Sequence, residues 1–251
     1  MFIHNINPTL LKLGPLELRY YGLVYVLGFI ATFFYLNHLV KNKKIKLSQD
    51  QLSDLLFYLI LGVIFGGRIF YILFYNLKYY LNNPFEIFAV WHGGMSFHGA
   101  LIGLMIVLYY FSKKEKIKFY TLADIIVLPA ALFLFFGRIA NFINGELYGH
   151  ITNVSWAVKF QNISGYRHPS QIYEALKNIV IFSILSLQLN KSRKPGFLFW
   201  QFVFFYGLFR FFIEFFRFSP NYYFGLSTGQ YLCIFMIIPS SYILIKNHLT
   251  R

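Results

Sequence analysis

Seven charged side chains lie inside or at the ends of long apolar stretches of this sequence: Arg68, Arg138, Glu146, Glu174, Arg210, Glu214 and Arg217. A charge at membrane depth is costly unless it pairs or faces water, so each of these residues is a candidate for function. Arg210 and Glu214 lie four residues apart in YGLFRFFIEFFR (206–217), so they share one helix face and can pair. An ion pair that only locks helix packing is the alternative interpretation for these two residues.

A second polar block, GRIANFINGELYGH (137–150), closes one of the apolar stretches. It combines polar side chains with three glycines, namely Arg138, Asn141, Asn144 and Glu146 with Gly137, Gly145 and Gly149. Backbone of this kind is tolerated at membrane depth only where it lines a cavity or is buried in protein. The block therefore indicates a protein-lined cavity where the apolar stretch ends.

A third block, HGGMSFHGA (92–100), brings His98 into an apolar region behind two glycines that permit close backbone approach. A packing histidine is the alternative interpretation of a single ring at this position. Arg138 and Arg210 together with His98 suggest a ligand that carries phosphate, because guanidinium groups bind phosphate oxygens in a bidentate manner and keep their charge. At this depth the natural phosphate is the head group of a phospholipid.

The elements that must position these residues are apolar helices. Hydrophobic residues make up 57% of the chain and charged residues 13%, against about 25% charged in soluble domains, and the mean hydropathy is +0.54. Each apolar segment is long enough, at about 1.5 Å per residue, to cross a hydrocarbon core of about 30 Å. The segments are approximately 20–40, 52–75, 93–111, 120–136, 170–189, 197–216 and 226–245.

The loops between these segments predict the orientation, because Lys and Arg in short loops stay on the cytoplasmic side. KNKKIK (41–46), SKKEKIK (112–118) and NKSRKPG (190–196) are alternate connections and fall on one side. The sequence thus predicts an all-α integral membrane protein of about seven transmembrane helices, with the N-terminus outside, the C-terminus cytoplasmic and a small periplasmic segment after the fourth span.

We expect a single multi-span membrane domain over residues 1–251, in which the connection 137–169 carries part of the active site. The net charge of +14 is divided among short clusters between apolar segments. This pattern argues against a nucleic-acid partner, which a continuous basic face would indicate. It suits an anionic membrane surface better.

The polar blocks, taken together, resemble those of the prolipoprotein diacylglyceryl transferase family, which carries out the first step of bacterial lipoprotein maturation. The resemblance covers nearly the whole chain in the family's order. It rests on YYGLVY (20–25), GGMSFHG (93–99), GRIANFINGELYG (137–149), RHPSQIYEA (167–175), YGLFRFFIEFFR (206–217) and STGQ (227–230).

The resemblance implies that the diacylglyceryl group of phosphatidylglycerol is transferred to the lipobox cysteine thiol in the signal peptide of a prolipoprotein, which forms a thioether and releases glycerol phosphate. It also implies a multi-pass protein of the bacterial inner membrane whose active site lies toward the periplasmic face. Besides phosphatidylglycerol and the prolipoprotein, only membrane lipids are expected as partners. The family uses no metal and no organic cofactor.

By motif match, the family's catalytic positions fall on His98, Arg138 and Arg210, with His98 expected to accept the thiol proton and the arginines to hold the departing phosphate. The substrate-binding positions fall on Tyr21, Arg68, Asn141, Glu146, Gly149, Tyr206 and Glu214. Within this group, the amide and the phenol at 141 and 206 are expected to orient the head group, and the carboxylates at 146 and 214 to fix the arginines.

Three other functions compete with this hypothesis. A transporter for an anionic solute would also place arginines and glycine-broken helices at membrane depth, but the sequence shows no repeated halves. An intramembrane metalloprotease needs two histidines four residues apart near a carboxylate, whereas His92 and His98 are six apart. A purely structural membrane subunit would leave the dense polar blocks unexplained.

Overall fold

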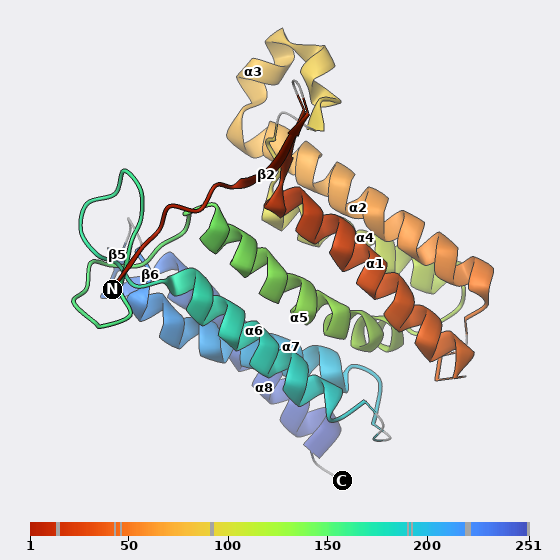
Figure 1. Cartoon of the computed structure of the whole chain (residues 1–251). Coiled ribbons are helices and arrows are strands. Elements are labelled where there is room, and N and C mark those ends of the chain that lie inside the picture. Colours follow the sequence, from red (N-terminus) through yellow and green to blue (C-terminus); the bar gives the residue numbers. More distant parts are fainter. Residues whose placement is uncertain are drawn as a thin grey trace. The chain divides into compact units, whose positions relative to one another are not determined.

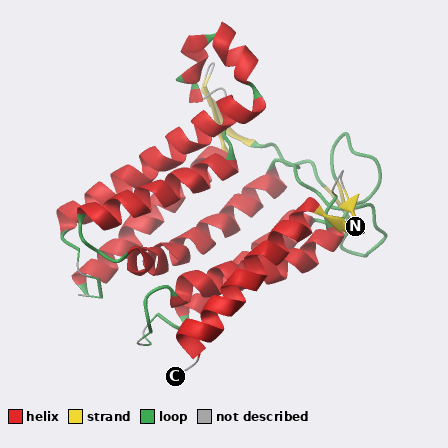
Figure 2. Ribbon diagram, turned by 180° about the vertical axis from the view of Figure 1, so that it is seen from behind, coloured by secondary structure: helices red, strands yellow, loops and turns green. Residues whose placement is uncertain are grey.

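The computed structural model describes residues 1–13, 16–42, 44–45, 47–90, 93–189, 191, 193–218 and 222–249. The chain forms two compact units, one made of residues 1–30 and 124–251 and the other of residues 31–123. Helices dominate both units, and the strands are short (Figure 2). Each of the seven segments predicted to span the membrane is helical over most of its length.

The unit of residues 31–123 is built around two long helices. It contains the second part of α1 (Tyr20–Lys41), then α2 (Gln49–Tyr75), α3 (Leu77–Asn82), the 3₁₀ turn η1 (Pro84–Ile87), α4 (Phe97–Lys114) and the first turn of α5 (Phe119–Ile143). A capping box starts α2, because the Ser48 hydroxyl accepts a hydrogen bond from Gln51 N at 3.1 Å and the Gln51 side chain accepts one from Ser48 N at 2.8 Å.

Helices α2 and α4 pack against each other at glycines four residues apart on each helix (Figure 1). A Cβ atom on Gly103 would lie 2.0 Å from the carbonyl oxygen of Gly62, and one on Gly99 would lie 2.3 Å from that of Gly66. Small residues at this spacing let two helix backbones approach closely, which replaces the missing hydrophobic driving force between helices in lipid.

The other unit holds the remaining helices and, among the residues that the structure describes, all the strands. Its elements are β1 (Phe2–Ile3), β2 (Thr9–Leu13), β3 (Leu16–Arg19), the start of α1, most of α5, β4 (Val158–Lys159), α6 (Ser170–Ser186), α7 (Phe197–Ile213), the 3₁₀ turn η3 (Glu214–Phe216), β5 (Tyr222–Tyr223), β6 (Leu226–Ser227), α8 (Thr228–Leu244) and the π-helical turn η4 (Ile245–Leu249). Helix α7 packs against both α6 and α8 (Figure 1).

Helix α7 begins at a glycine that has no side chain to cap it, and α5 supplies the cap instead. Gly196 adopts a φ of 96°, which glycine tolerates without strain. The Asp124 carboxylate accepts hydrogen bonds from Gly196 N at 2.7 Å and from Phe199 N at 2.8 Å. This contact joins α5 to the first turn of α7 and sets the position of both helices.

Short backbone segments of this unit form a β layer around the connection between α5 and α6. Strands β1 and β4 pair in parallel, and β2 and β3 form a separate antiparallel hairpin. Antiparallel bridges extend the layer from Val158 to Arg167, from Arg167 to Ile151, and from Gly149 to Arg217. The layer thus joins the N-terminal strand to the residue that follows α7 and η3.

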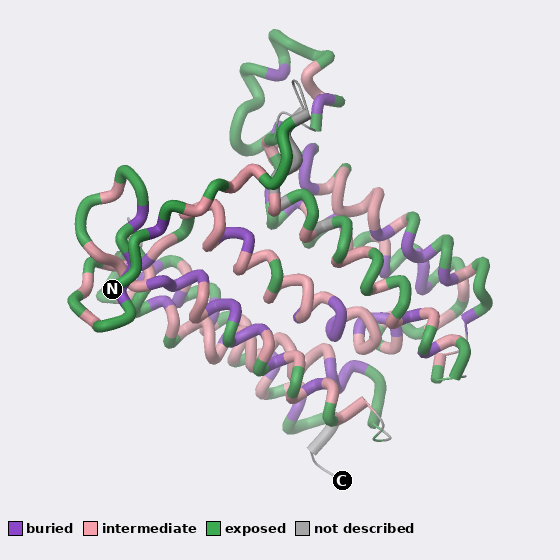
Figure 3. The backbone as a smooth tube through the Cα atoms, viewed as in Figure 1, coloured by how far each residue is buried: buried purple, intermediate pink, exposed green. Residues whose placement is uncertain are grey.

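Five helical stretches are long and apolar enough to cross a membrane: Gly22–Lys41, Gln49–Tyr75, Phe119–Ile143, Phe197–Phe216 and Thr228–Asn247. Many of their large apolar side chains are exposed. Figure 3 colours the exposed residues of these helices green. Exposed apolar surface on this scale suits lipid, so the chain is a multi-pass membrane protein. The two other helices expected to span, α4 and α6, fall below this measure; α6 has only 17 residues and buries several polar side chains.

Candidate active site

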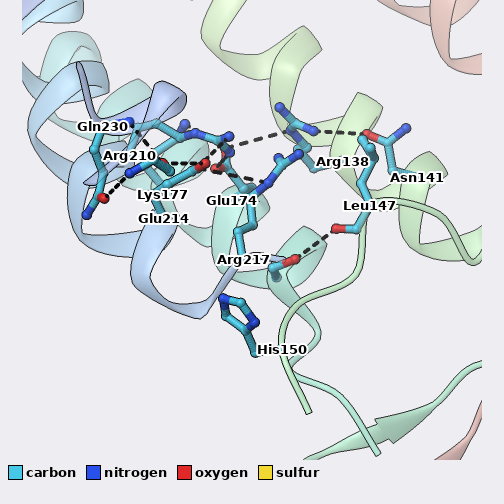
Figure 4. A network of polar contacts seen from close by, with 12 residues as sticks. Arg138, Asn141, Leu147, His150, Glu174, Lys177, Arg210, Glu214, Arg217 and Gln230 are labelled. Atoms are coloured by element: carbon cyan, nitrogen blue, oxygen red, sulfur yellow. Dashed lines mark hydrogen bonds and ion pairs between the residues drawn. The ribbon is translucent and has the colours of Figure 1, made fainter. Parts of the chain in front are cut away.

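Glu174 lies at the centre of a network of charged side chains within the unit of residues 1–30 and 124–251 (Figure 4). Its side chain is 1% exposed. Oε1 accepts a hydrogen bond from Arg210, and Oε2 accepts one from Lys177 Nζ at 2.8 Å. Oε2 also lies 3.7 Å from Arg138 Nε. One carboxylate therefore contacts cations from three helices, α5, α6 and α7.

Arg210 also contacts a second carboxylate, that of Glu214, as the four-residue spacing predicted. Its Nη2 lies 2.8 Å from Glu214 Oε2. The Ser227 hydroxyl, which caps α8, donates a hydrogen bond to Glu214 Oε1 at 3.1 Å. Gly229 leaves room for this carboxylate, because a Cβ atom there would lie 2.5 Å from Oε1. The end of α7 and the start of α8 thus hold Glu214 in place beside Arg210.

Arg138 and Asn141 lie on α5, which continues through the polar block to Ile143 and does not end near residue 136 as the apolar pattern predicted. Arg138 Nη1 donates a hydrogen bond to Asn141 Oδ1 at 3.3 Å. Asn141 Nδ2 in turn donates to Glu146 Oε1 at 2.7 Å. The described contacts connect Glu146 to Arg138 through Asn141, and the carboxylate nearest to Arg138 is that of Glu174.

A cavity of about 370 Å³ lies beside the network, lined by Gly145, Glu146, Leu147, Tyr148, Arg217 and Phe218. Arg217 Nε lies 4.0 Å from Glu214 Oε2, a looser contact than that of Arg210. Burial, together with the charges of Arg210 and Arg138, lowers the pKa of Arg217 to about 10. The guanidinium is still protonated at neutral pH, so the cavity has a cationic wall.

Gly149 is required for the β layer that carries Arg217. Its amide donates a hydrogen bond to His168 O at 2.9 Å, and its backbone bridges that of Arg217. A Cβ atom on Gly149 would lie 2.3 Å from Phe216 O, so any larger residue would force the two segments apart. The predicted importance of this position thus has a steric basis.

The family model described as prolipoprotein diacylglyceryl transferase matches residues 8–246 of this chain. Phosphatidylglycerol–prolipoprotein diacylglyceryl transferase of Geobacter sulfurreducens is 49% identical over 229 residues, covering 90% of this chain and 88% of that protein. The protein of the same name from Rickettsia rickettsii is 42% identical over 258 residues, covering 99% of both chains. The chain belongs to the prolipoprotein diacylglyceryl transferase family.

In this member of the diacylglyceryl transferase family the structure brings Arg138 and Arg210 together, because both contact Glu174. Tyr206 lies on α7 in the same cluster, with the centre of its ring 3.5 Å from Lys177 Nζ. The side chain of Tyr21 lies outside the described residues, as does His92. His98 and Arg68 belong to the unit of residues 31–123, and their relation to the two arginines stays a prediction.

Arg68 has a dense set of partners within its own unit. Its side chain is buried and donates hydrogen bonds to backbone carbonyl oxygens of the chain between α3 and α4, including those of Ile87 and Ala89, both at 3.0 Å. Its guanidinium also lies 5.0 Å from the centre of the Tyr80 ring. These contacts fix the segment that leads to Ser96, the N-cap of α4, and to His98, which is exposed at the start of that helix.

Sequence reasoning recognised Glu174 and Arg217 as charges at membrane depth but did not assign them to the site, and it overlooked Lys177. The available signal was a second charge three residues after Glu174 inside an apolar segment, a spacing that places both on one helix face. Among the described residues, no group of three or more histidine, cysteine, aspartate or glutamate side chains is arranged to hold a metal ion.

Proposed function

We propose that this protein transfers the diacylglyceryl group of phosphatidylglycerol to the lipobox cysteine of a prolipoprotein, and that Arg138 and Arg210 bind the phosphate of the lipid head group. Family membership supports the transferase activity. The observation that carries the assignment of the site is that guanidinium groups from α5 and α7 meet at one buried carboxylate. An anionic group already lies where the phosphate would bind.

The charges of the cluster favour an anionic ligand. Four cations, Arg138, Lys177, Arg210 and Arg217, surround two carboxylates, Glu174 and Glu214, which leaves a net charge of +2. Glu146, one hydrogen-bonded side chain further away, reduces this to +1. A phosphodiester carries one negative charge and a phosphate monoester up to two. Both the lipid and the released product therefore suit the cluster electrostatically.

The reaction proceeds by displacement at carbon. The cysteine thiolate forms a bond to the glyceryl carbon that carries the phosphate ester, the carbon–oxygen bond breaks, and its electron pair leaves on the phosphate oxygen. A thiol with an ordinary pKa of about 8.5 must first lose its proton, and His98 accepts it. Arg138 and Arg210 stabilise the negative charge that grows on the departing glycerol phosphate.

The other predicted residues support this arrangement. Asn141 links Arg138 to Glu146 and orients the head group, as Tyr206 does from α7. Glu214 holds Arg210 beside the phosphate, and the cavity next to Arg217 accommodates the glycerol of the head group. Gly149 maintains the wall of this cavity. Tyr21 and Arg68 complete the substrate-binding set, with Arg68 acting through the segment that precedes His98.

The membrane arrangement proposed with this function has seven spans, with α4 and α6 included. The polar side chains of α6 are buried against protein, so this helix does not need an apolar surface all round. The N-terminus lies outside and the C-terminus in the cytoplasm, because the basic loops fall on one side. We propose that residues 1–251 form a single membrane domain, with the connection 137–169 and the active site at the periplasmic face of the bacterial inner membrane.

The decisive experiment uses the purified full chain in vesicles that contain phosphatidylglycerol labelled in its acyl chains, with a lipobox peptide as acceptor. The expected product is a peptide that carries the label through a thioether, and a peptide with serine in place of cysteine should stay unlabelled. A transporter or a structural subunit would give no labelled peptide, and that result would overturn the proposal.

A further inference from the structure

We propose that Glu174 and Lys177 form a positioning pair in which Glu174 occupies the arginine donors until phosphate displaces it, and Lys177 then remains as the counterion of Glu174. The inference rests on the proposed role of Arg138 and Arg210 as phosphate ligands. Glu174 competes with phosphate for the same arginine donors, and Lys177 controls how strongly Glu174 competes.

The two oxygens of Glu174 divide the cations in a way that suits exchange. Lys177 bonds to Oε2, whereas Arg210 bonds to Oε1, so the arginine can leave without disturbing the lysine (Figure 4). Arg138 is held less tightly, because its Nε lies 3.7 Å from Oε2, beyond hydrogen-bond distance. Both arginines can therefore transfer donors to a phosphate that enters between them.

Each arginine also keeps a second anchor when Glu174 is displaced. Arg210 remains in contact with Glu214 through Nη2 at 2.8 Å, and Arg138 remains bonded to Asn141. The guanidinium groups therefore need only small rotations to change partners. A phosphate with several acceptor oxygens can satisfy both at once, which a single carboxylate does less well.

Burial explains why Lys177 is needed. The side chains of Glu174 and Lys177 are each 1% exposed, so water cannot replace a lost partner. A buried carboxylate left without a counterion is strongly unfavourable. Lys177 lies three residues after Glu174 on the same helix, so the helix itself maintains their contact. Its Nζ also faces the ring of Tyr206, which favours an ammonium at that position.

Substitution of Glu174 and substitution of Lys177 should change the affinity for phosphate in opposite directions. Glu174→Gln removes the competing charge but keeps the shape, so phosphate should bind the arginines more tightly. Lys177→Met removes the ammonium but keeps the length of the side chain, so the arginines become the sole counterions of Glu174 and phosphate should bind less tightly. A role in packing alone would weaken phosphate binding in both variants.

The test measures inhibition by glycerol 1-phosphate, the proposed product, in competition with phosphatidylglycerol in vesicles that contain the full chain. We expect the inhibition constant to fall about tenfold in Glu174→Gln and to rise about tenfold in Lys177→Met, within the range of typical coupling between two sites. Lys177→Arg, which keeps the charge, should stay close to the parent value. Shifts of both single variants in one direction, or no shift in either, would overturn the inference.

A double variant, Glu174→Gln with Lys177→Met, covers the case in which Lys177→Met does not fold. It removes both charges of the pair, so no lysine is left without its carboxylate, and it should inhibit like Glu174→Gln. An inhibition constant at or above that of the parent would contradict the proposed competition. The parent protein separates the two proposals. If glycerol 1-phosphate does not compete with phosphatidylglycerol in the parent, the phosphate site itself is wrong, whereas competition in the parent with unchanged variants rejects only the role of the pair.

Discussion

Lys177 Nζ lies 3.5 Å from the centre of the Tyr206 ring, so a buried ammonium on α6 faces an aromatic ring on α7. Such a contact is worth about 2 kcal/mol when both groups are desolvated. The contact joins α6, which carries both Glu174 and Lys177, to α7, which carries the Arg210 that pairs with Glu174. The ring of Tyr206 thus belongs to the same network as the arginines, independently of its hydroxyl group.

The first prediction separates the ring of Tyr206 from its hydroxyl. Tyr206→Leu should lower the free energy of unfolding by about 2 kcal/mol, because the cation–π contact is lost. Tyr206→Phe should keep that stability, yet lower transfer activity if the hydroxyl orients the head group. Thermal unfolding in detergent and the peptide lipidation assay measure the two effects. Equal stability of the leucine variant and the parent would rule out a contribution from the contact.

The second prediction concerns the two arginines. Arg138→Ala and Arg210→Ala should each reduce kcat/KM for phosphatidylglycerol about 100- to 1000-fold, because one donor to the growing phosphate charge is lost. Arg210→Lys should recover little of the activity, since an ammonium cannot contact Glu214 and the phosphate as a planar fork does. The matched control is Arg193→Ala, which alters an exposed arginine in the basic connection before α7. Substantial lipidation by both alanine variants would refute the site assignment.

The third prediction concerns the cap that α5 supplies to α7. Asp124→Asn should lower the free energy of unfolding by about 1 kcal/mol, because the amide retains one acceptor oxygen where the carboxylate uses two. Asp54→Asn serves as the control. That carboxylate is half exposed and pairs with Lys114 at 3.0 Å, so Asp54→Asn should change stability less than Asp124→Asn does. The idea fails if the two variants unfold at the same temperature.

The fourth prediction is a pH dependence of stability that arises from His168. Partial burial and the nearby His150 lower the pKa of His168 below its usual 6.5. Between the lowered value and 6.5 the unfolded chain binds more protons than the folded chain, so His168 disfavours folding increasingly as the pH falls through that window. Well above pH 6.5 the ring is neutral in both states, and His168 then no longer lowers the stability of the folded chain.

Melting temperatures of the parent and of His168→Gln at pH 7.5 and 5.5 measure this effect. The parent should lose more stability on acidification than the variant does. His38→Gln, which alters an exposed histidine on α1, is the control. An identical loss in the parent and in His168→Gln would show that protonation of His168 is not responsible.

The sequence by itself determined the helices and the contacts within them. Apolar length predicted seven helical segments, because a chain in lipid must satisfy its backbone hydrogen bonds within each segment. The pairing of Arg210 with Glu214 was equally accessible, since a four-residue spacing brings two side chains together on any helix. The block at 137–150 also indicated a polar site, although the helix runs further into it than the apolar pattern suggested.

Only the tertiary structure decided which charges meet between helices. The sequence around Glu174 does not indicate that its carboxylate pairs with Arg210 on α7 and Arg138 on α5. These ion pairs depend on how the three helices pack against one another. The same holds for Arg217 and Glu146, which line one cavity. The backbone bridge between Gly149 and Arg217 brings Arg217 to this cavity. Spacing along the chain sets contacts within one helix, whereas contacts between helices follow from packing of whole surfaces, to which each residue contributes only a part.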